Sequence, residues 1–256
     1  MATTEPGVQA PRTRRAAATG RSADRVVEEP AFVLHATPWR ETSLIVELLT
    51  RSHGRIACVA KGAKRPRSAL RGVLLSFQPL SVGFAGRQEL RTLTAAEWLG
   101  GMRAPQGDGL LCGFYLNELL VRLLPRDDPH PALFDAYAEA LVSLGFEGSP
   151  EACLRRFEWR LLREIGYAMD LSHDAQNRPV RADARYALLP GRGFLATDGR
   201  DPADFQGHTL LDMADERYDS ARTLSEAKRL TRTLLGRHLD GHVLKTRQIL
   251  MDLHKL

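Results

Sequence analysis

Short apolar runs separated by turn residues dominate the chain between residues 31 and 97. They are rich in β-branched and large apolar side chains, which predicts five strands. The runs are AFVLH (31–35), SLIVELLT (43–50), RIACVA (55–60), LSFQPLSVGFA (75–85) and ELRTLTAAE (89–97). Five short strands with close turns favour a small closed barrel of the OB type, because closure removes exposed strand edges. An SH3-like barrel fits the same pattern.

The pattern changes to a helical period after the stretch RAPQGDG (103–109). We expect a buried helix over 110–124, where nearly every side is apolar, and amphipathic helices over 132–146, 149–167 and 224–239. Ser149 and Pro150 suit the start of the third helix, and Gly166 suits its end. A capping box from Thr223 to Glu226 is expected to start the last one.

The predicted fold class is therefore α+β, with a five-stranded OB-type barrel followed by a mainly α-helical domain. Residues 1–29 have little to bury and are predicted to be a disordered tail. We place the barrel at 30–106 and the helical domain at 107–256. An irregular insert occupies about 170–207 and contains a short hairpin around YALLPGRGFLA.

Composition is that of a soluble globular protein, with 43% hydrophobic and 26% charged residues in 256. The cysteines are Cys58, Cys112 and Cys153, which are odd in number and far apart. This spacing argues against a disulfide framework and a local zinc site, and we expect no metal, no cofactor and a reducing cytoplasm. No apolar run is long enough to span a membrane, and the start of the chain has no secretory signal.

Positive charge is concentrated in the barrel segment. Between Leu48 and Gln88 the chain has eight basic residues and no Asp or Glu, whereas the whole chain has a net charge of only +5. A basic block on a near-neutral background indicates a polyanionic partner such as nucleic acid. The candidate nucleic-acid-binding residues from this block are Arg55, Lys61, Lys64, Arg65, Arg67, Arg71 and Arg87.

Most of these cations lie in the stretch VAKGAKRPRSALRG, Val59 to Gly72. A solvated connector is the ordinary interpretation of a charge run. A run of one sign that joins two strands of a small barrel instead favours contact with phosphates, since barrel loops of this kind reach over oligonucleotides. Trp39, beside Pro38 and Arg40, is the best candidate for stacking on a base.

The helix predicted over 149–167 carries four arginines. Arg156, Arg160 and Arg163 share a face, which we expect to be solvated and partly paired with Glu164. Arg155 lies nearer the apolar side of Leu154 and Trp159. An arginine at the rim of an apolar groove can hold a carboxylate while the groove takes a hydrophobic tail.

Signatures of common enzymes are missing: the sequence has no GxxxxGK[ST], GxGxxG, GxSxG or HExxH motif. Adjacent pairs such as His173–Asp174 and Asp127–Asp128 are a weak sign of catalysis. We therefore expect no enzymatic activity. A metal-dependent nuclease and an RNA-binding OB module are the alternatives.

Several long stretches resemble the RecO family of bacterial recombination mediators. They are AFVLHATPWRETSLIVELLTRSHGRIACVAKGAKRPRS, GFYLNELLVRLLPRDDPHPALFDAY, LRRFEWRLLREIGY and AKRLTRTLL, and the match runs in order from about 31 to 250. The resemblance implies an OB-fold and a helical domain, binding to single- and double-stranded DNA, annealing of complementary strands, and help in loading RecA on DNA coated with the single-stranded-DNA-binding protein SSB. It also implies partnership with RecR and a cytoplasmic, nucleoid-associated location.

The same resemblance implies a docking site for the C-terminal tail of SSB on the helical domain. The arginine of the LRRFE motif that carries this contact matches Arg155 here. The candidate tail-binding residues are Arg155, Leu154, Trp159, Lys228 and Arg232. Some family members hold zinc with four cysteines after the GY motif, but this region has no cysteine here, so we predict no zinc.

Overall fold

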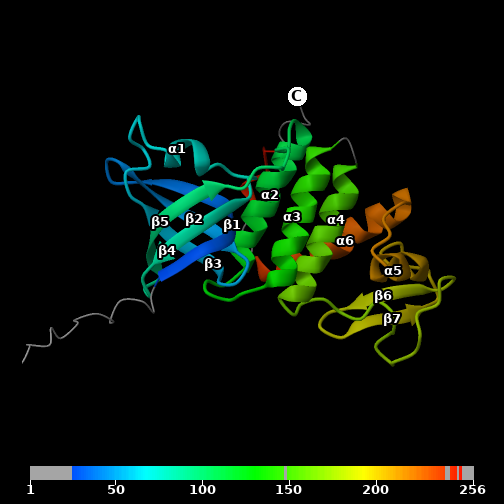
Figure 1. Ribbon diagram of the computed structural model, residues 1–256. Helices are drawn as coiled ribbons and strands as arrows, with labels where there is room; N and C mark the ends of the chain where they lie inside the picture. The colour runs from blue at the N-terminus through cyan, green and yellow to red at the C-terminus, as the bar shows by residue number, and fades with distance from the viewer. Residues whose placement is uncertain (1–24, 147–148, 240–242, 247, 250–256) are drawn as a thin grey trace, which may run out of the picture.

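The computed structural model describes residues 25–146, 149–239, 243–246 and 248–249. Figure 1 shows a β-barrel packed against a layer of helices, with a small sheet and two further helices on the other side. The predicted tail is shorter than expected, because residues 25–29 already belong to the first strand. The rest of the tail prediction, residues 1–24, lies outside the described residues.

Five strands close the barrel in the order β1-β2-β3-β5-β4, with β4 returning to β1. Only β3 and β5 pair in parallel. This is the predicted OB-type barrel and not an SH3-like one. The strands are β1 (Arg25–Trp39), β2 (Ser43–Thr50), β3 (Gly54–Ala60), β4 (Leu80–Ala85) and β5 (Leu90–Trp98).

The run predicted as a strand over 75–85 forms one only from Leu80. Phe77 has a left-handed φ of 68°, and Pro79 has no N–H for the ladder. Phe77 is nevertheless buried, because its ring packs edge-on against Phe114 of the first long helix at a centroid distance of 4.9 Å. The apolar residues before Leu80 therefore belong to the joint between barrel and helices.

The four predicted helices are present in order, with shifts of a few residues. Two further helices were not predicted: Leu70–Val73, between β3 and β4 in the barrel half, and Gly207–Ala214, after the insert. The helices are α1 (Leu70–Val73), α2 (Asp108–Leu123), α3 (Pro131–Gly145), α4 (Pro150–Glu164), α5 (Gly207–Ala214) and α6 (Ala221–His238). The insert holds the predicted hairpin, β6 (Arg185–Leu189) and β7 (Gly193–Thr197), extended by β8 (Phe205–Gln206).

The predicted capping box of the last helix is wrong. α6 begins earlier, and the Ser220 side chain accepts a hydrogen bond from the Thr223 N–H at 3.0 Å. Glu226 instead accepts from the Gln206 N–H at 2.9 Å, which ties α6 to β8. Gly166 has the expected left-handed φ of 78° after α4, whereas Ser149 stands at the N-cap position without a side-chain cap.

One hydrophobic core joins the outer face of the barrel to the helices, and a second core fills the barrel interior. Phe32 of β1 points out of the barrel, and its ring lies 5.2 Å from those of Phe134 and Tyr137 on α3. Asn117 of α2 donates to the Leu34 carbonyl at 2.9 Å and accepts from the Tyr137 hydroxyl. The expected boundary near residue 106 marks a change of element type, but packing continues across it.

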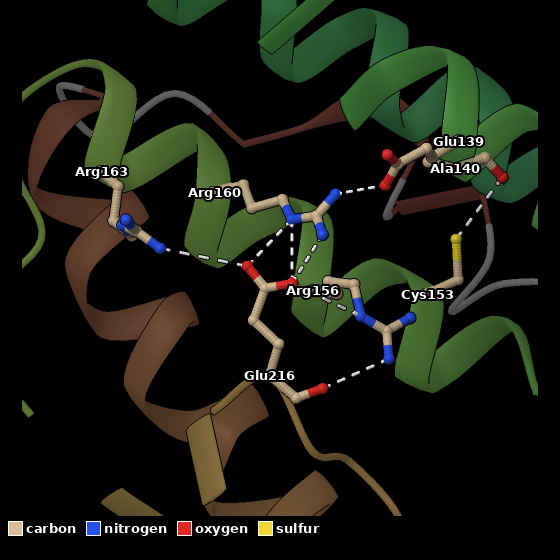
Figure 2. Close-up of polar contacts among 7 residues, drawn as sticks. All are labelled: Glu139, Ala140, Cys153, Arg156, Arg160, Arg163 and Glu216. Atoms are coloured by element: carbon tan, nitrogen blue, oxygen red, sulfur yellow. Dashed lines mark hydrogen bonds and ion pairs between the residues drawn. The ribbon is translucent and has the colours of Figure 1, made fainter. Parts of the chain in front are cut away.

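The arginine face of α4 is clamped to the chain between α5 and α6 (Figure 2). Glu216 accepts from Arg160 Nε at 2.9 Å and from Nη2 at 2.6 Å, and Arg156 donates to its carbonyl at 3.3 Å. Arg163 lies 4.0 Å from the same carboxylate. The arginines share a face as predicted, but Glu164 is not their partner, because it lies 3.6 Å from His130.

We expect Asn117→Ala to destabilise the whole protein. The variant leaves a buried carbonyl and a buried hydroxyl without partners, which costs about 2–3 kcal/mol of unfolding free energy. Tyr137→Phe removes only one of the two hydrogen bonds and is expected to cost about 1 kcal/mol. Urea unfolding measures both values. Equal stabilities for Asn117→Ala and wild type would contradict the proposed joint.

The Glu216 clamp predicts a pH-dependent stability. The Arg160 guanidinium, which donates to Glu216, holds the pKa of that carboxyl below its ordinary value of 4.5 although partial burial opposes this. A carboxyl whose pKa is lowered in the folded state stabilises the protein at pH values above its ordinary pKa. This stabilisation is lost as the pH falls through the folded-state pKa. Glu216→Gln should therefore cost about 2 kcal/mol near pH 7.

The difference in unfolding free energy between wild type and Glu216→Gln should shrink as the pH falls below 4.5. Glu139→Gln is the matched control, because Glu139 pairs with the same Arg160 but is mostly exposed, so its loss costs less. A difference that stays constant with pH would show that the carboxylate charge is not what stabilises the clamp.

Candidate nucleic-acid interface

The segment between β3 and β4 is an ordered series of turns that leads into the short helix α1, and not a loose connector. Backbone hydrogen bonds join Ala60 to Ala63, Gly62 to Arg65, Arg65 to Ser68 and Ser68 to Arg71. Gly62 has a φ of 71°, which glycine adopts without strain. Ala63 and Leu74 are buried in the barrel core, so both ends of the segment are anchored.

Five cations of this segment project into solvent, and together with their backbone we call residues 61–71 the basic loop. Its exposed cations are Lys61, Lys64, Arg65, Arg67 and Arg71. None of them forms an ion pair with any residue that the structure describes, whereas most of the other described arginines do. The basic loop therefore presents uncompensated positive charge on a fixed backbone.

The turn between β1 and β2 extends this surface. The Lys64 N–H donates to the Thr42 carbonyl at 2.9 Å, so the basic loop and this turn lie side by side at one end of the barrel (Figure 1). Trp39 is 39% exposed there, and the Arg40 guanidinium carbon lies 5.8 Å from its ring centroid. Arg40 was absent from the predicted set, although its position beside Trp39 in a predicted turn could have indicated it.

Two of the predicted DNA-binding arginines do not join this surface. Arg55 is half-buried: it pairs with Glu47 at 2.9 Å and donates to the Leu124 carbonyl at 3.0 Å, so it fastens the barrel to the helices. The charge of Arg55 is therefore compensated within the protein, and DNA binding by Arg55 stays a prediction. Arg87 is exposed, but it lies in the β4–β5 turn, at the end of β4 away from the basic loop.

The predicted tail-binding arginine is buried. Arg155 is 5% exposed and pairs at 2.5 Å with Glu158, which also accepts from the hydroxyls of Tyr115 and Thr231. Burial alone would lower the pKa of Arg155, but the Glu158 carboxylate raises it above the ordinary value. The expectation that Arg155 stands at the rim of an open groove is therefore wrong, because a buried acid already holds it.

The other candidates for tail binding are divided between the core and the surface. Trp159 is buried, and Leu154 is partly buried against the helical core. Lys228 and Arg232 are exposed one turn apart on α6, and Lys228 pairs with Glu151 of α4 at 3.2 Å. The five residues do not form one accessible groove.

The cysteines are free, and burial raises the pKa of the Cys58 thiol to about 12 and that of Cys112 to about 11. Within the described ranges, no group of three or more His, Cys, Asp or Glu side chains is placed to hold a metal ion. In the same ranges, no helix combines the length and apolar character that crossing a bilayer requires.

Comparison with known proteins gives consistent matches over both halves of the chain. Residues 25–102 match the family model for the N-terminal part of recombination protein O, and residues 105–248 match that for its C-terminal part. The DNA repair protein RecO of Burkholderia pseudomallei (strain 1710b) is 52% identical over 100% of this chain and 94% of its own length. That of Azoarcus sp. (strain BH72) is 51% identical over 91% of this chain and 98% of its own, and that of Ralstonia nicotianae is 50% identical over 98% and 94%.

These matches confirm the resemblance noted in the sequence and agree with the barrel and helical halves described above. The chain belongs to the RecO family of DNA repair and recombination proteins.

Proposed function

We propose that this protein binds single- and double-stranded DNA with the end of its barrel, anneals complementary strands, and helps RecA load on SSB-coated DNA together with RecR. The observation that carries the DNA-binding part is the basic loop, with five exposed cations that have no ion-pair partner among the described residues. Membership of a DNA repair and recombination family supports the remainder.

The chemistry of the surface suits binding without sequence preference. Lysine and arginine side chains neutralise phosphates and release condensed counterions, which gives strong, salt-sensitive binding to any sequence. Trp39 adds an exposed ring on which a base of any kind can stack. Annealing requires such sequence-independent binding, because strong recognition of base edges by the protein would compete with pairing between the strands.

The anchored backbone of the basic loop pre-organises the binding surface. Turns and buried anchors fix the basic loop before DNA arrives, so little backbone entropy is lost on binding. The link from Lys64 to Thr42 holds the stacking residue and the cations in one fixed arrangement. A strand that follows this surface meets phosphate contacts and a stacking platform together.

Partnership with the SSB tail and with RecR is part of the proposal and comes from the family. In this proposal Arg155 has a different role from the one predicted, because its buried side chain pairs with Glu158. We infer that Arg155 and Glu158 position α6 through the Thr231 hydroxyl, so that their effect on any partner is indirect.

The rival functions are separated by a direct assay. Labelled single-stranded DNA is incubated with the protein, with and without Mg²⁺, and RNA of the same sequence is added as competitor. Salt-sensitive binding without cleavage, and with no preference for RNA, supports the proposal. Protein-dependent cleavage would establish a nuclease, and a preference for RNA would establish an RNA-binding module.

Replacing Lys64, Arg65 and Arg67 with Ala should weaken DNA binding and flatten its salt dependence. Each phosphate that the protein no longer neutralises reduces the slope of log K against log salt by about 0.7 for single strands, so the triple variant should reduce it by about 2. Fluorescence anisotropy of a labelled oligonucleotide at several salt concentrations measures both quantities.

The matched control replaces three exposed arginines elsewhere, Arg103, Arg181 and Arg200, with Ala. It changes the net charge equally but leaves the basic loop intact. A slope that falls equally in both variants would mean that general charge, and not this loop, drives binding.

Trp39→Ala should weaken binding to single strands by about 1–3 kcal/mol if a base stacks on the ring. Duplex binding should change less, since paired bases are not free to stack on the protein. Trp39→Phe keeps a ring and should retain most of the affinity. Competition between the two forms of DNA measures the preference, and an unchanged preference in Trp39→Ala would remove Trp39 from the site.

A further inference from the structure

A second basic surface lies along α6, on the helical side of the molecule. One face of this helix forms a shallow groove whose lining is entirely polar or glycine: Ser225, Lys228, Arg229, Arg232, Thr233, Gly236 and Arg237. Arg232 and Arg237 are exposed and form no ion pair within the described part of the chain. Arg229 donates only to the carbonyls of Pro202 and Asp204, so no carboxylate neutralises it.

The groove continues into a pocket at the C-terminal end of α6, and Arg237 lines both. Here Tyr167 and His238 stack face to face, with ring centroids 3.5 Å apart and an interplanar angle of 11°. Tyr167 is 47% exposed. Arg192, from the β6–β7 turn, is exposed and also lines this pocket.

The acids near this surface are already engaged. Glu151 pairs with Lys228 at 3.2 Å. In the pocket, Asp170 lies 3.0 Å from His173, and Asp174 pairs with Arg178 at 2.6 Å. The cations here without an acidic partner among the described residues are therefore Arg229, Arg232 and Arg237, which line the groove, and Arg192, which lines the pocket together with Arg237.

We propose that this groove and pocket form a second binding track for a single DNA strand, distinct from the basic loop of the barrel. The residues from Ser225 to His238 extend about 20 Å at the rise of an α-helix, which gives room for several phosphates. The arginines contact the phosphates, and the Tyr167–His238 stack receives a base. This inference rests on the proposed function: the basic loop binds one strand, and the track along α6 binds the second strand for annealing.

The composition of the track favours a nucleic acid over an acidic peptide. A tail with hydrophobic side chains requires an apolar pocket to receive them. The groove along α6 is open, and serine, threonine, glycine, lysine and arginine line it; the apolar side chains Ala168, Met169 and Leu234 line only the pocket at its end. The aromatic group stands at the end of a row of cations, which is the arrangement that single-strand binders use.

The position of the track fits simultaneous binding of two strands. The barrel contacts α2, whereas α6 contacts α4 and α5, so the layer of α2, α3 and α4 separates α6 from the barrel (Figure 1). A strand on the basic loop and a strand on α6 therefore do not compete for the same residues. Strands held on one rigid body are kept close, which raises their effective concentration for pairing.

Native mass spectrometry with a short non-pairing oligonucleotide tests this directly, using full-length proteins. Wild type should hold two strands per protein chain. Arg232→Ala/Arg237→Ala should hold one, the triple basic-loop variant should hold one, and the combination should hold none. Tyr167→Ala should weaken the second strand roughly five-fold or more, and Tyr167→Phe should restore it.

Arg181→Ala/Arg200→Ala is the matched control, since it removes two exposed arginines from the same half of the molecule outside the track. It should hold two strands. The annealing rate of complementary strands should fall in the α6 double variant and in the triple basic-loop variant. It should stay at the wild-type value in the control.

Two results would overturn the inference: a wild type that holds one strand per chain, or an α6 variant that still holds two. If the α6 variant still holds two strands but no longer binds an acidic SSB-tail peptide, α6 is a peptide site. This result also overturns the inference. The proposed function fails separately, if the basic-loop variant binds DNA as wild type does.

Discussion

The outer face of β1 is the constraint on which the rest of this structure depends. The strand alternates between two cores: Ala31 and Val33 face the barrel interior, whereas Phe32 and Leu34 face the helices. The Leu34 carbonyl is held by Asn117, which also binds the Tyr137 hydroxyl. Because one strand serves both cores, the barrel cannot turn against the helices without breaking buried hydrogen bonds. Residues on opposite sides of the molecule are thus fixed relative to each other.

Ion pairs reinforce the same joint at its edge. Glu47 of β2 holds both Arg55 and Arg126, and Arg91 of β5 reaches Asp127 at 2.7 Å. The arginines in these pairs are neutralised within the protein, so they present no uncompensated charge for DNA binding. They also explain why the cations of the basic loop differ from the rest: the loop lies at the end of the barrel that the acidic residues of the α2–α3 connection do not reach. Charge left without a partner is concentrated there by the fold.

Local signals predicted the elements well. The strand SLIVELLT was predicted with its observed bounds, because alternation and a following turn are properties of adjacent residues. Failures occurred where a distant residue decided the outcome. Phe77 was assigned to a strand although α2 takes its ring, and Glu226 to a capping box although β8 takes its carboxylate. For Arg155, the helical position was correct, but no pattern in the sequence shows that its side chain is buried against Glu158, which Thr231 holds from α6.

The buried pair of Arg155 and Glu158 shows how such distant contacts shape the surface. An ion pair inside a helical core gains little net stability, because desolvation offsets the attraction, so its value lies in fixing geometry. Glu158 accepts from Tyr115 of α2 and Thr231 of α6 as well as from Arg155 of α4, and so ties three helices at one carboxylate. Thr231 is adjacent to Arg232 on α6, so the inward side of the helix is pinned while the next residue is presented to solvent. The buried charge therefore sets the orientation of α6, and that orientation decides which of its arginines face outward.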